Sequence, residues 1–217
     1  MTPGAGGRAC IAVGIALSAA FAVLAHAALV EGVSPAVGAA LSTLPLVLLV
    51  LWFARRTRHR AAIVIAALAV GLALWLGWGR LERHFPDLLF VEHAASNLFL
   101  AVLFGRTLAG GREPLITTFA RLVHGSLPPE VLRYTRSVTI AWTLFFAALF
   151  TASCALYLTG ERAAWSVLAN FATPIGVGAM FAIEYAVRHR VLPHWEHVGI
   201  MGGVRAFSRH ISQRPAS

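Results

Sequence analysis

Five polar side chains lie inside stretches of sequence that are otherwise apolar. Glu92, His93 and Asn97 belong to the run FVEHAASNLFLAVLF, His26 lies near the end of the first apolar run, and Asn170 lies in the last one. Carboxylate, imidazole and amide groups can move protons, bind polar substrates or hydrogen-bond neighbouring helices, and each is costly in an apolar environment. These five residues are therefore the first candidates for a site inside the protein.

The spacing of Glu92, His93 and Asn97 limits what they can do together. In a helix, His93 and Asn97 share a face because they are four positions apart, whereas Glu92 points about 100° away from His93. Glu92 and His93 should therefore contact different neighbouring helices, and His26 and Asn170 are candidate partners. Three interpretations stay open: an interhelical network that fixes packing, a site that handles protons or substrate, or groups exposed to water near the membrane surface.

Sharper catalytic motifs are missing from the sequence. It has no phosphate-binding glycine loop, no HExxH pair of zinc ligands and no GxSxG nucleophile motif. Its two cysteines, Cys10 and Cys154, fall within apolar runs and resemble neither a metal-ligand set nor a disulfide framework. The sequence therefore nominates no catalytic residue, no metal site and no cofactor.

The composition indicates that these residues are held in a membrane. Of the 217 residues 58% are hydrophobic and 12% charged, and the mean hydropathy is +0.73. Apolar runs near the ~20 residues needed to cross a bilayer recur along the chain. We predict an all-α, polytopic membrane protein forming a single domain, with six spans at 9–30, 36–54, 61–79, 88–105, 138–158 and 164–187.

The arginines predict the orientation of these spans. All 18 basic residues are arginine, and with six spans 15 of them fall on one side and three, Arg80, Arg83 and Arg162, on the other. Positive charge favours the cytoplasmic side, so both termini, the loop 106–137 and the basic tail 188–217 are predicted to be cytoplasmic. The five intramembrane polar residues then lie in the outer half of the bilayer. A cleaved signal peptide is the alternative for 9–30, but that run is long for a signal core.

The loop 106–137 carries an amphipathic pattern. Apolar residues from Leu115 to Val123 recur on one helical face, opposite Arg121, which is typical of a short helix lying in the membrane interface. Pro128-Pro129-Glu130 then predicts the start of a second helix. The loop arginines could anchor the chain to anionic lipid or dock an acidic partner; the candidates are Arg106, Arg112, Arg121, Arg133 and Arg136.

The last predicted span contains two further features. Glu184 precedes Arg188 by one turn, in the order that favours an ion pair within a helix. Thr173-Pro174 predicts a kink or a loosened turn beside Asn170. We interpret Glu184 and Arg188 as a structural ion pair.

Two segments of the C-terminal half carry a family resemblance. FGRTLAGGREPLITTFARLVHGSLPPEVLRYTRSVTIAWTLFF (104–146) and ANFATPIGVGAMFAIEYAVRHRVLP (169–193) resemble a family of small bacterial inner-membrane proteins. Its members are encoded near fatty-acid-synthase-like gene clusters of the aryl polyene type and are sometimes labelled "ketosynthase". The resemblance implies a place in lipid or fatty-acid biosynthesis but no catalytic residues. Ketosynthase chemistry would need an activated cysteine beside histidines, which neither Cys10 nor Cys154 has at helical spacing.

Together these observations predict an accessory or scaffold protein of the bacterial inner membrane. Its basic cytoplasmic face would dock acidic acyl carrier proteins or biosynthetic enzymes, with the lipid bilayer as its other partner. The alternative is a small transporter or flippase of a lipid or small-molecule intermediate, with the polar cluster lining the path. A nucleic-acid partner is not expected, because the arginines flank the spans as topology requires.

Overall fold

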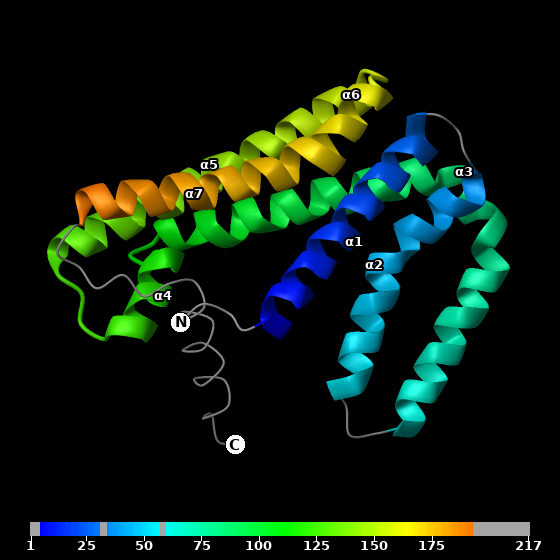
Figure 1. The fold of residues 1–217 in the computed structure, drawn as a ribbon, viewed down its shortest axis with the longest axis horizontal. Coiled ribbons are helices and arrows are strands. Elements are labelled where there is room, and N and C mark those ends of the chain that lie inside the picture. The colour runs from blue at the N-terminus through cyan, green and yellow to red at the C-terminus, as the bar shows by residue number, and fades with distance from the viewer. Residues whose placement is uncertain (1–4, 31–33, 57–59, 193–217) are drawn as a thin grey trace. The chain divides into compact units, whose positions relative to one another are not determined.

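The structure, a computed structural model, describes residues 5–30, 34–56 and 60–192, and all regular structure in these ranges is helical. The predicted all-α class is therefore confirmed for this part of the chain. The tail from residue 193 onward and the side chains of Arg55, Arg56, Arg58 and Arg60 lie outside the described residues. The elements (Figure 1) are α1 (Ala5–Val30), α2 (Pro35–Arg56), α3 (Arg60–Gly105), the 3-10 turn η1 (Arg106–Leu108), α4 (Leu115–His124), α5 (Pro129–Leu158), α6 (Arg162–Val167), the π-helical turn η2 (Leu168–Ala172) and α7 (Thr173–Val191).

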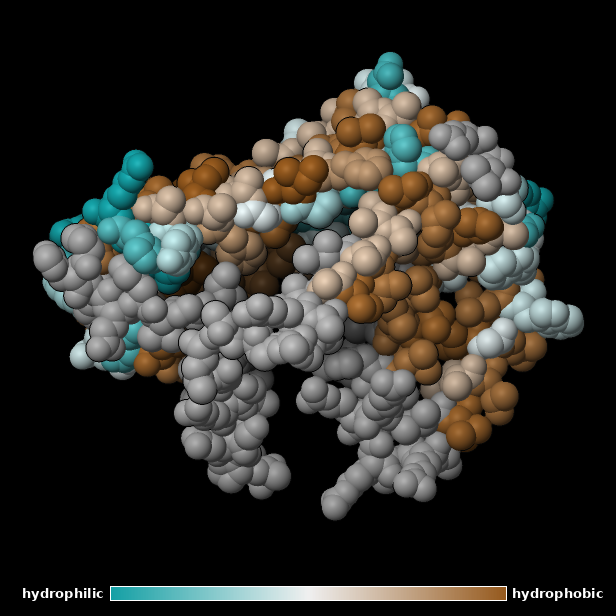
Figure 2. Space-filling model, in the orientation of Figure 1, coloured by the Kyte–Doolittle hydropathy of each residue, from teal (hydrophilic) through white to brown (hydrophobic). Residues whose placement is uncertain are grey.

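Four helical stretches are long and apolar enough to cross a bilayer: Ala12–Val30, Val64–Leu108, Pro129–Leu158 and Arg162–Val191. Large apolar side chains on them face outward, with Trp75 75% exposed and Leu68 68% exposed. Figure 2 shows apolar residues spread over the visible surface of the described helices. Contiguous exposed apolar surface on this scale is incompatible with water and fits hydrocarbon. The described chain thus has the architecture of a helical membrane protein.

The four stretches differ from the six predicted spans for an identifiable reason. The third and fourth predicted spans, 61–79 and 88–105, are joined into the single 46-residue helix α3. The second predicted span, 36–54, is helical as part of α2, and its described apolar stretch covers Pro35–Leu44. The sequence predicts a break at Phe85-Pro86-Asp87, whereas the chain bends there and remains helical on both sides.

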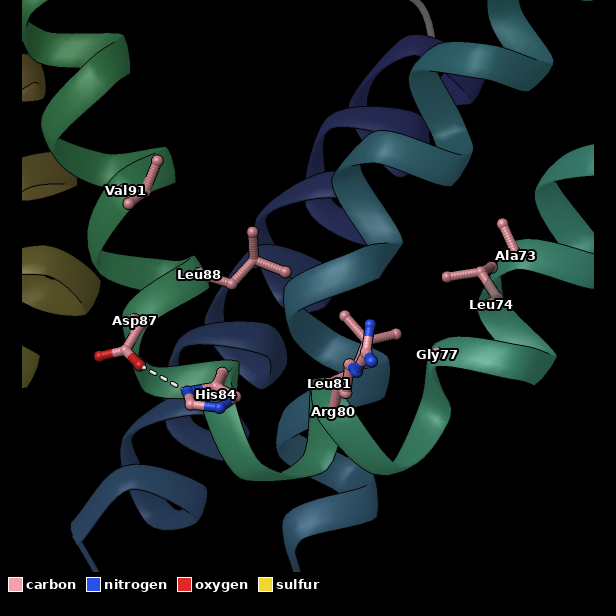
Figure 3. A pocket seen from close by; sticks show the side chains of 9 residues that line it. All are labelled: Ala73, Leu74, Gly77, Arg80, Leu81, His84, Asp87, Leu88 and Val91. Atoms are coloured by element: carbon pink, nitrogen blue, oxygen red, sulfur yellow. Dashed lines mark hydrogen bonds and ion pairs between the residues drawn. The ribbon is translucent and has the colours of Figure 1, made fainter.

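Pro86 causes the bend in α3. Proline has no N–H to donate to the carbonyl one turn earlier, and its ring crowds that carbonyl. The backbone responds at His84, which leaves helical geometry with φ −118° and ψ 15°. Asp87 closes the bend by accepting from His84 Nδ1 at 3.1 Å (Figure 3). It also accepts from the hydroxyl of Tyr157. The two arms of α3 thereby differ in direction without a loop between them.

The helices form two compact units, and the first comprises the chain up to His93 together with Ser153–Pro174. Its apolar core places Phe85, 8% exposed, against Ala28 of α1 and Ala39 of α2. Gly38 permits this approach, because a Cβ atom there would lie 2.5 Å from the Phe85 ring. Small residues at helix contacts are the usual means of close packing in lipid.

The second unit comprises Ala94–Ala152 and, among the described residues, 175–192. Trp142 of α5, 5% exposed, lies at its centre. Its ring centroid is 4.9 Å from that of Phe181 in α7 and 5.4 Å from that of Phe146. Gly176 lets α7 approach α5, since a Cβ atom there would lie 3.1 Å from the Phe145 ring. Aromatic packing around one tryptophan therefore holds this unit together.

Candidate intramembrane polar site and basic loop

His93 joins three helical segments of the first unit. Its Nδ1 atom lies 3.0 Å from Ser153 Oγ on α5, and its Nε2 atom lies 3.0 Å from Thr173 Oγ1 at the start of α7. Trp165 of α6 donates from Nε1 to the same Ser153 oxygen at 2.9 Å. Ser153 and Trp165 are essentially inaccessible, at 0% and 1% exposure. The imidazole is thus the centre of a buried polar connection between elements that are distant in sequence.

The directions of these hydrogen bonds determine the tautomer of His93. Thr173 donates its only hydroxyl proton to the Leu168 carbonyl at 2.9 Å, so it must accept from His93 Nε2. Indole N–H groups only donate, so Ser153 accepts from Trp165 and has its own proton for His93 Nδ1. His93 is therefore protonated on Nε2, and with Ser153 donating to Nδ1 a chain of donors runs from Trp165 through Ser153 and His93 to Thr173.

His26 and Asn170 meet on a different serine of the same unit. Ser166, 0% exposed, has its Oγ atom 2.8 Å from His26 Nδ1. Asn170 donates from Nδ2 to Ser166 Oγ at 3.1 Å and to the Ser166 carbonyl at 3.0 Å. The ring of His26 also packs edge-on against Phe171, with centroids 5.5 Å apart. This cluster connects α1 to α6 and η2.

The π-helical turn Leu168–Ala172 positions Asn170 and Thr173. The Thr173 N–H bonds the carbonyl of Leu168, five residues earlier, and the Thr173 hydroxyl bonds the same oxygen. Pro174 follows and cannot donate an N–H, which accounts for the widening of the helix. The loosened turn predicted from Thr173-Pro174 is confirmed. Single π turns within α-helices often occur at functional sites.

Glu92 differs from its neighbours in its hydrogen bonding. Its Oε1 atom is buried and has no hydrogen-bond partner among the residues that the structure describes. A buried carboxyl oxygen without a partner is costly, and a proton or a cation held at this oxygen would reduce the cost. Among the described residues of the first unit, Glu92 therefore has a buried oxygen that is available to a proton or a further ligand.

The five predicted polar residues therefore divide into separate groups. His26 and Asn170, which the sequence offers as partners for Glu92 and His93, share Ser166 instead, while His93 bonds Ser153 and Thr173. Asn97 belongs to the second unit, where it is 4% exposed. Sequence reasoning missed Ser153, Trp165 and Ser166. Small hydroxyls and tryptophan are common in membrane helices, so only their position in the fold distinguishes them.

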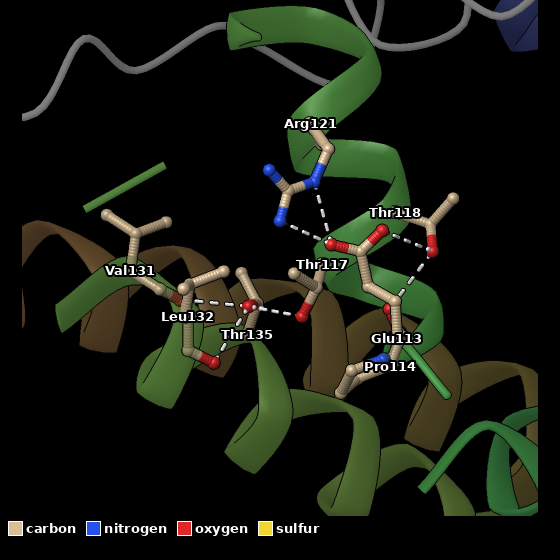
Figure 4. A network of polar contacts seen from close by, with 8 residues as sticks. All are labelled: Glu113, Pro114, Thr117, Thr118, Arg121, Val131, Leu132 and Thr135. Carbon is tan, nitrogen blue, oxygen red and sulfur yellow. Dashed lines mark hydrogen bonds and ion pairs between the residues drawn. The ribbon is translucent and has the colours of Figure 1, made fainter. Parts of the chain in front are cut away.

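Hydroxyl groups dock α4 in the basic loop of the second unit (Figure 4). The N–H groups of its first turn, from Leu115 and Ile116, donate to the hydroxyls of Thr107 and Thr139 at 3.0 and 3.3 Å. Thr117, 2% exposed, pairs with Thr135 of α5 through hydroxyl oxygens 2.7 Å apart. First-turn N–H groups have no acceptor within their own helix, so these side chains both cap α4 and fix it to its neighbours.

All five candidate docking arginines lie in this unit with exposed side chains. Arg121 is held by Glu113 at 2.7 Å, and Arg136 donates to the Leu108 carbonyl at 3.4 Å. The other three, Arg106, Arg112 and Arg133, form no ion pair with a carboxylate of the described residues. The segment from η1 to the start of α5, which contains α4, therefore carries exposed guanidinium groups with little local neutralisation.

Glu184 and Arg188 lie together in α7. Arg188 Nε is 3.5 Å from Glu184 Oε1. Tyr134 of α5 donates its hydroxyl to the Glu184 carboxylate at 3.1 Å and to the Glu184 carbonyl at 3.0 Å. Glu184 is thus bonded both by Arg188 within α7 and by Tyr134 of the neighbouring helix α5.

These features define a helical membrane protein with an internal histidine network and a basic loop. Among the described side chains, no three histidine, cysteine, aspartate or glutamate residues gather as metal ligands. The chain matches no protein-family model, no curated protein and no solved structure.

Proposed function

We propose that this chain is an accessory protein of the bacterial inner membrane that docks acidic acyl carrier proteins, or enzymes that carry them, during synthesis of a fatty-acid-like lipid. The observation that carries the proposal is the exposure of five arginines on α4 and on the segments that flank it in the sequence. The resemblance to inner-membrane proteins encoded beside fatty-acid-synthase-like genes supplies the biosynthetic setting.

The basic loop has the physical properties of a docking surface. An array of like charges steers an acidic partner toward it and raises the association rate. Threonine hydroxyls hold α4 in place, so docking would not require the loop to be ordered first. Arg106, Arg112 and Arg133 can offer their full charge to a partner, whereas Arg121 already faces Glu113.

The proposal includes six crossings with both termini in the cytoplasm. The bend at Pro86 supports this count, because a straight helix of 46 residues would be roughly 70 Å long, more than twice a ~30 Å hydrocarbon core. Two arms of about 20 residues each can instead cross separately. The arginine distribution then places the loop 106–137 in the cytoplasm, where acyl carriers are found.

Binding of a purified acidic acyl carrier protein to the full-length protein in nanodiscs tests the docking role. The triple variant Arg106→Gln, Arg112→Gln, Arg133→Gln should weaken binding about tenfold or more, since each exposed charge contributes roughly 0.5–1 kcal/mol. Arg80→Gln, Arg83→Gln, Arg162→Gln is the matched control, because it removes the same charge from the predicted outer side. Equal loss in both triple variants would contradict the proposal.

A second candidate function, transport of a small molecule or lipid intermediate, is favoured by two features of the first unit, the unpartnered Glu92 oxygen and the π turn whose Thr173 bonds His93. Broken or widened helices next to ionisable residues are features of transport sites. Glu92→Gln separates the two functions. A transporter should lose flux while keeping carrier binding, whereas a docking protein should keep both its binding and its product.

A further inference from the structure

The bend of α3 encloses a groove that neither the docking surface nor the histidine network uses. It has a volume of about 490 Å³, within the ~300–1,000 Å³ typical of small-molecule sites. Figure 3 shows Leu74 on one arm and Leu88 on the other, both directed into the space between the arms. The lining residues are Ala73, Leu74, Gly77, Arg80, Leu81, His84, Asp87, Leu88 and Val91.

The lining is amphipathic along the groove. The arms are apolar, and the polar residues lie at the bend, where His84 and Asp87 pair with each other at 3.1 Å. Arg80 is exposed, and no carboxylate of the described residues forms an ion pair with it. The groove therefore presents apolar walls with one uncompensated cation at its polar end.

Tryptophans mark the level of this polar end in the bilayer. Trp75 is 75% exposed, and Trp78 donates from its indole to Glu82 at 2.8 Å. Tryptophan concentrates at the boundary between hydrocarbon and headgroups. Arg80 is then at headgroup depth, and the apolar walls extend toward the hydrocarbon core.

We propose that this groove binds one phospholipid with an anionic headgroup, its acyl chain between the arms of α3 and its phosphate against Arg80. The charge and the depth of Arg80 complement the headgroup. The bend places the polar lining residues at one end of the groove and the apolar walls beyond them, as the headgroup and acyl chain of a phospholipid require. Gly77 leaves space for the chain, because no atom lies within 4 Å of where its Cβ would be.

Photo-crosslinking of the full-length protein in nanodiscs tests this site. The nanodiscs contain phosphatidylcholine with a minor fraction of phosphatidylglycerol that carries a diazirine in its acyl chain. Wild type should form adducts concentrated in residues 73–91. Gly77→Phe should fill the groove and lower those adducts about fivefold or more, whereas Gly71→Phe, on the same arm and equally unobstructed, should leave them unchanged.

A second pair of variants tests the headgroup. Arg80→Gln should reduce labelling by phosphatidylglycerol about fivefold relative to a phosphatidylcholine probe, the effect of one arginine near the surface. Arg83→Gln, which removes a nearby charge outside the groove lining, should not. Adducts spread equally over the exposed apolar surface in all variants would overturn the proposal. So would a wild-type protein without adducts in residues 73–91, because the groove would then be inaccessible to lipid.

Discussion

At the scale of single residues, the hydrogen bonds of His93 explain why a histidine is accommodated in an apolar helix. Its two ring nitrogens meet an oxygen that can donate and an oxygen that must accept, on Ser153 and Thr173. A neutral ring protonated on Nε2 satisfies both. Histidine ¹⁵N chemical shifts of the protein in nanodiscs should report this tautomer for His93, and an Nδ1-protonated or charged ring would contradict the assignment.

Replacement of His93 should destabilise the fold. His93→Leu removes both interhelical hydrogen bonds and should lower the free energy of unfolding by about 1–2 kcal/mol, since such bonds in membrane proteins average roughly 0.6 kcal/mol and reach about 1.7. His93→Gln, which retains an acceptor and a donor, should recover part of the loss. Thermal unfolding in detergent measures both, with Val102→Leu, at an exposed position of the same helix, as control. A His93→Leu midpoint equal to wild type would refute a structural role.

At the scale of helices, α4 shows how short elements can be fixed by hydroxyl groups. Thr117 and Thr135 face each other in a buried contact at 2.7 Å. Thr135→Val should cost about 0.5–1.5 kcal/mol by leaving the buried Thr117 hydroxyl without its partner. Thr117→Val should cost less, because the Thr135 hydroxyl keeps the Val131 carbonyl as acceptor, and the double variant should cost less than the sum of the two. Thermal unfolding of the four proteins gives the coupling energy. Thr118→Val, whose hydroxyl bonds within its own segment, is the control, and zero coupling would contradict the contact.

The sequence predicted elements better than it predicted contacts. Apolar length located the helices, and Pro128-Pro129 marked the start of α5 at Pro129. The sequence did not predict that α3 continues through Pro86. A proline can either bend a helix or end it, and the outcome depends on which residues pack against the bend. Here Phe85 against Gly38 and Asp87 with Tyr157 supply that packing. Both involve residues distant in sequence, as do Ser153 and Ser166, so a periodic pattern could not identify them.

At the scale of the whole molecule, the predicted topology places the ends of α5 on opposite sides of the membrane. A cysteine at Gly110 should react with an impermeant maleimide only from the cytoplasmic side, and a cysteine at Gly160 only from the outer side, with Cys10 and Cys154 replaced by alanine. A cysteine at Gly79 should behave like the one at Gly160, because the predicted spans 61–79 and 138–158 both end on the outer side. Labelling of positions 110 and 160 from the same side would exclude a crossing by α5.

The proposed function makes the basic loop the partner of an acidic carrier, and ionic strength tests that claim most directly. Exposed charges are screened over about 10 Å at 0.1 M salt and about 3 Å at 1 M. We expect the affinity of an acidic acyl carrier protein for the nanodisc-embedded protein to fall at least about tenfold between 0.05 and 0.5 M NaCl, by analogy with other electrostatically steered pairs. No binding at the lower salt concentration, or binding that salt leaves unchanged, would contradict the account.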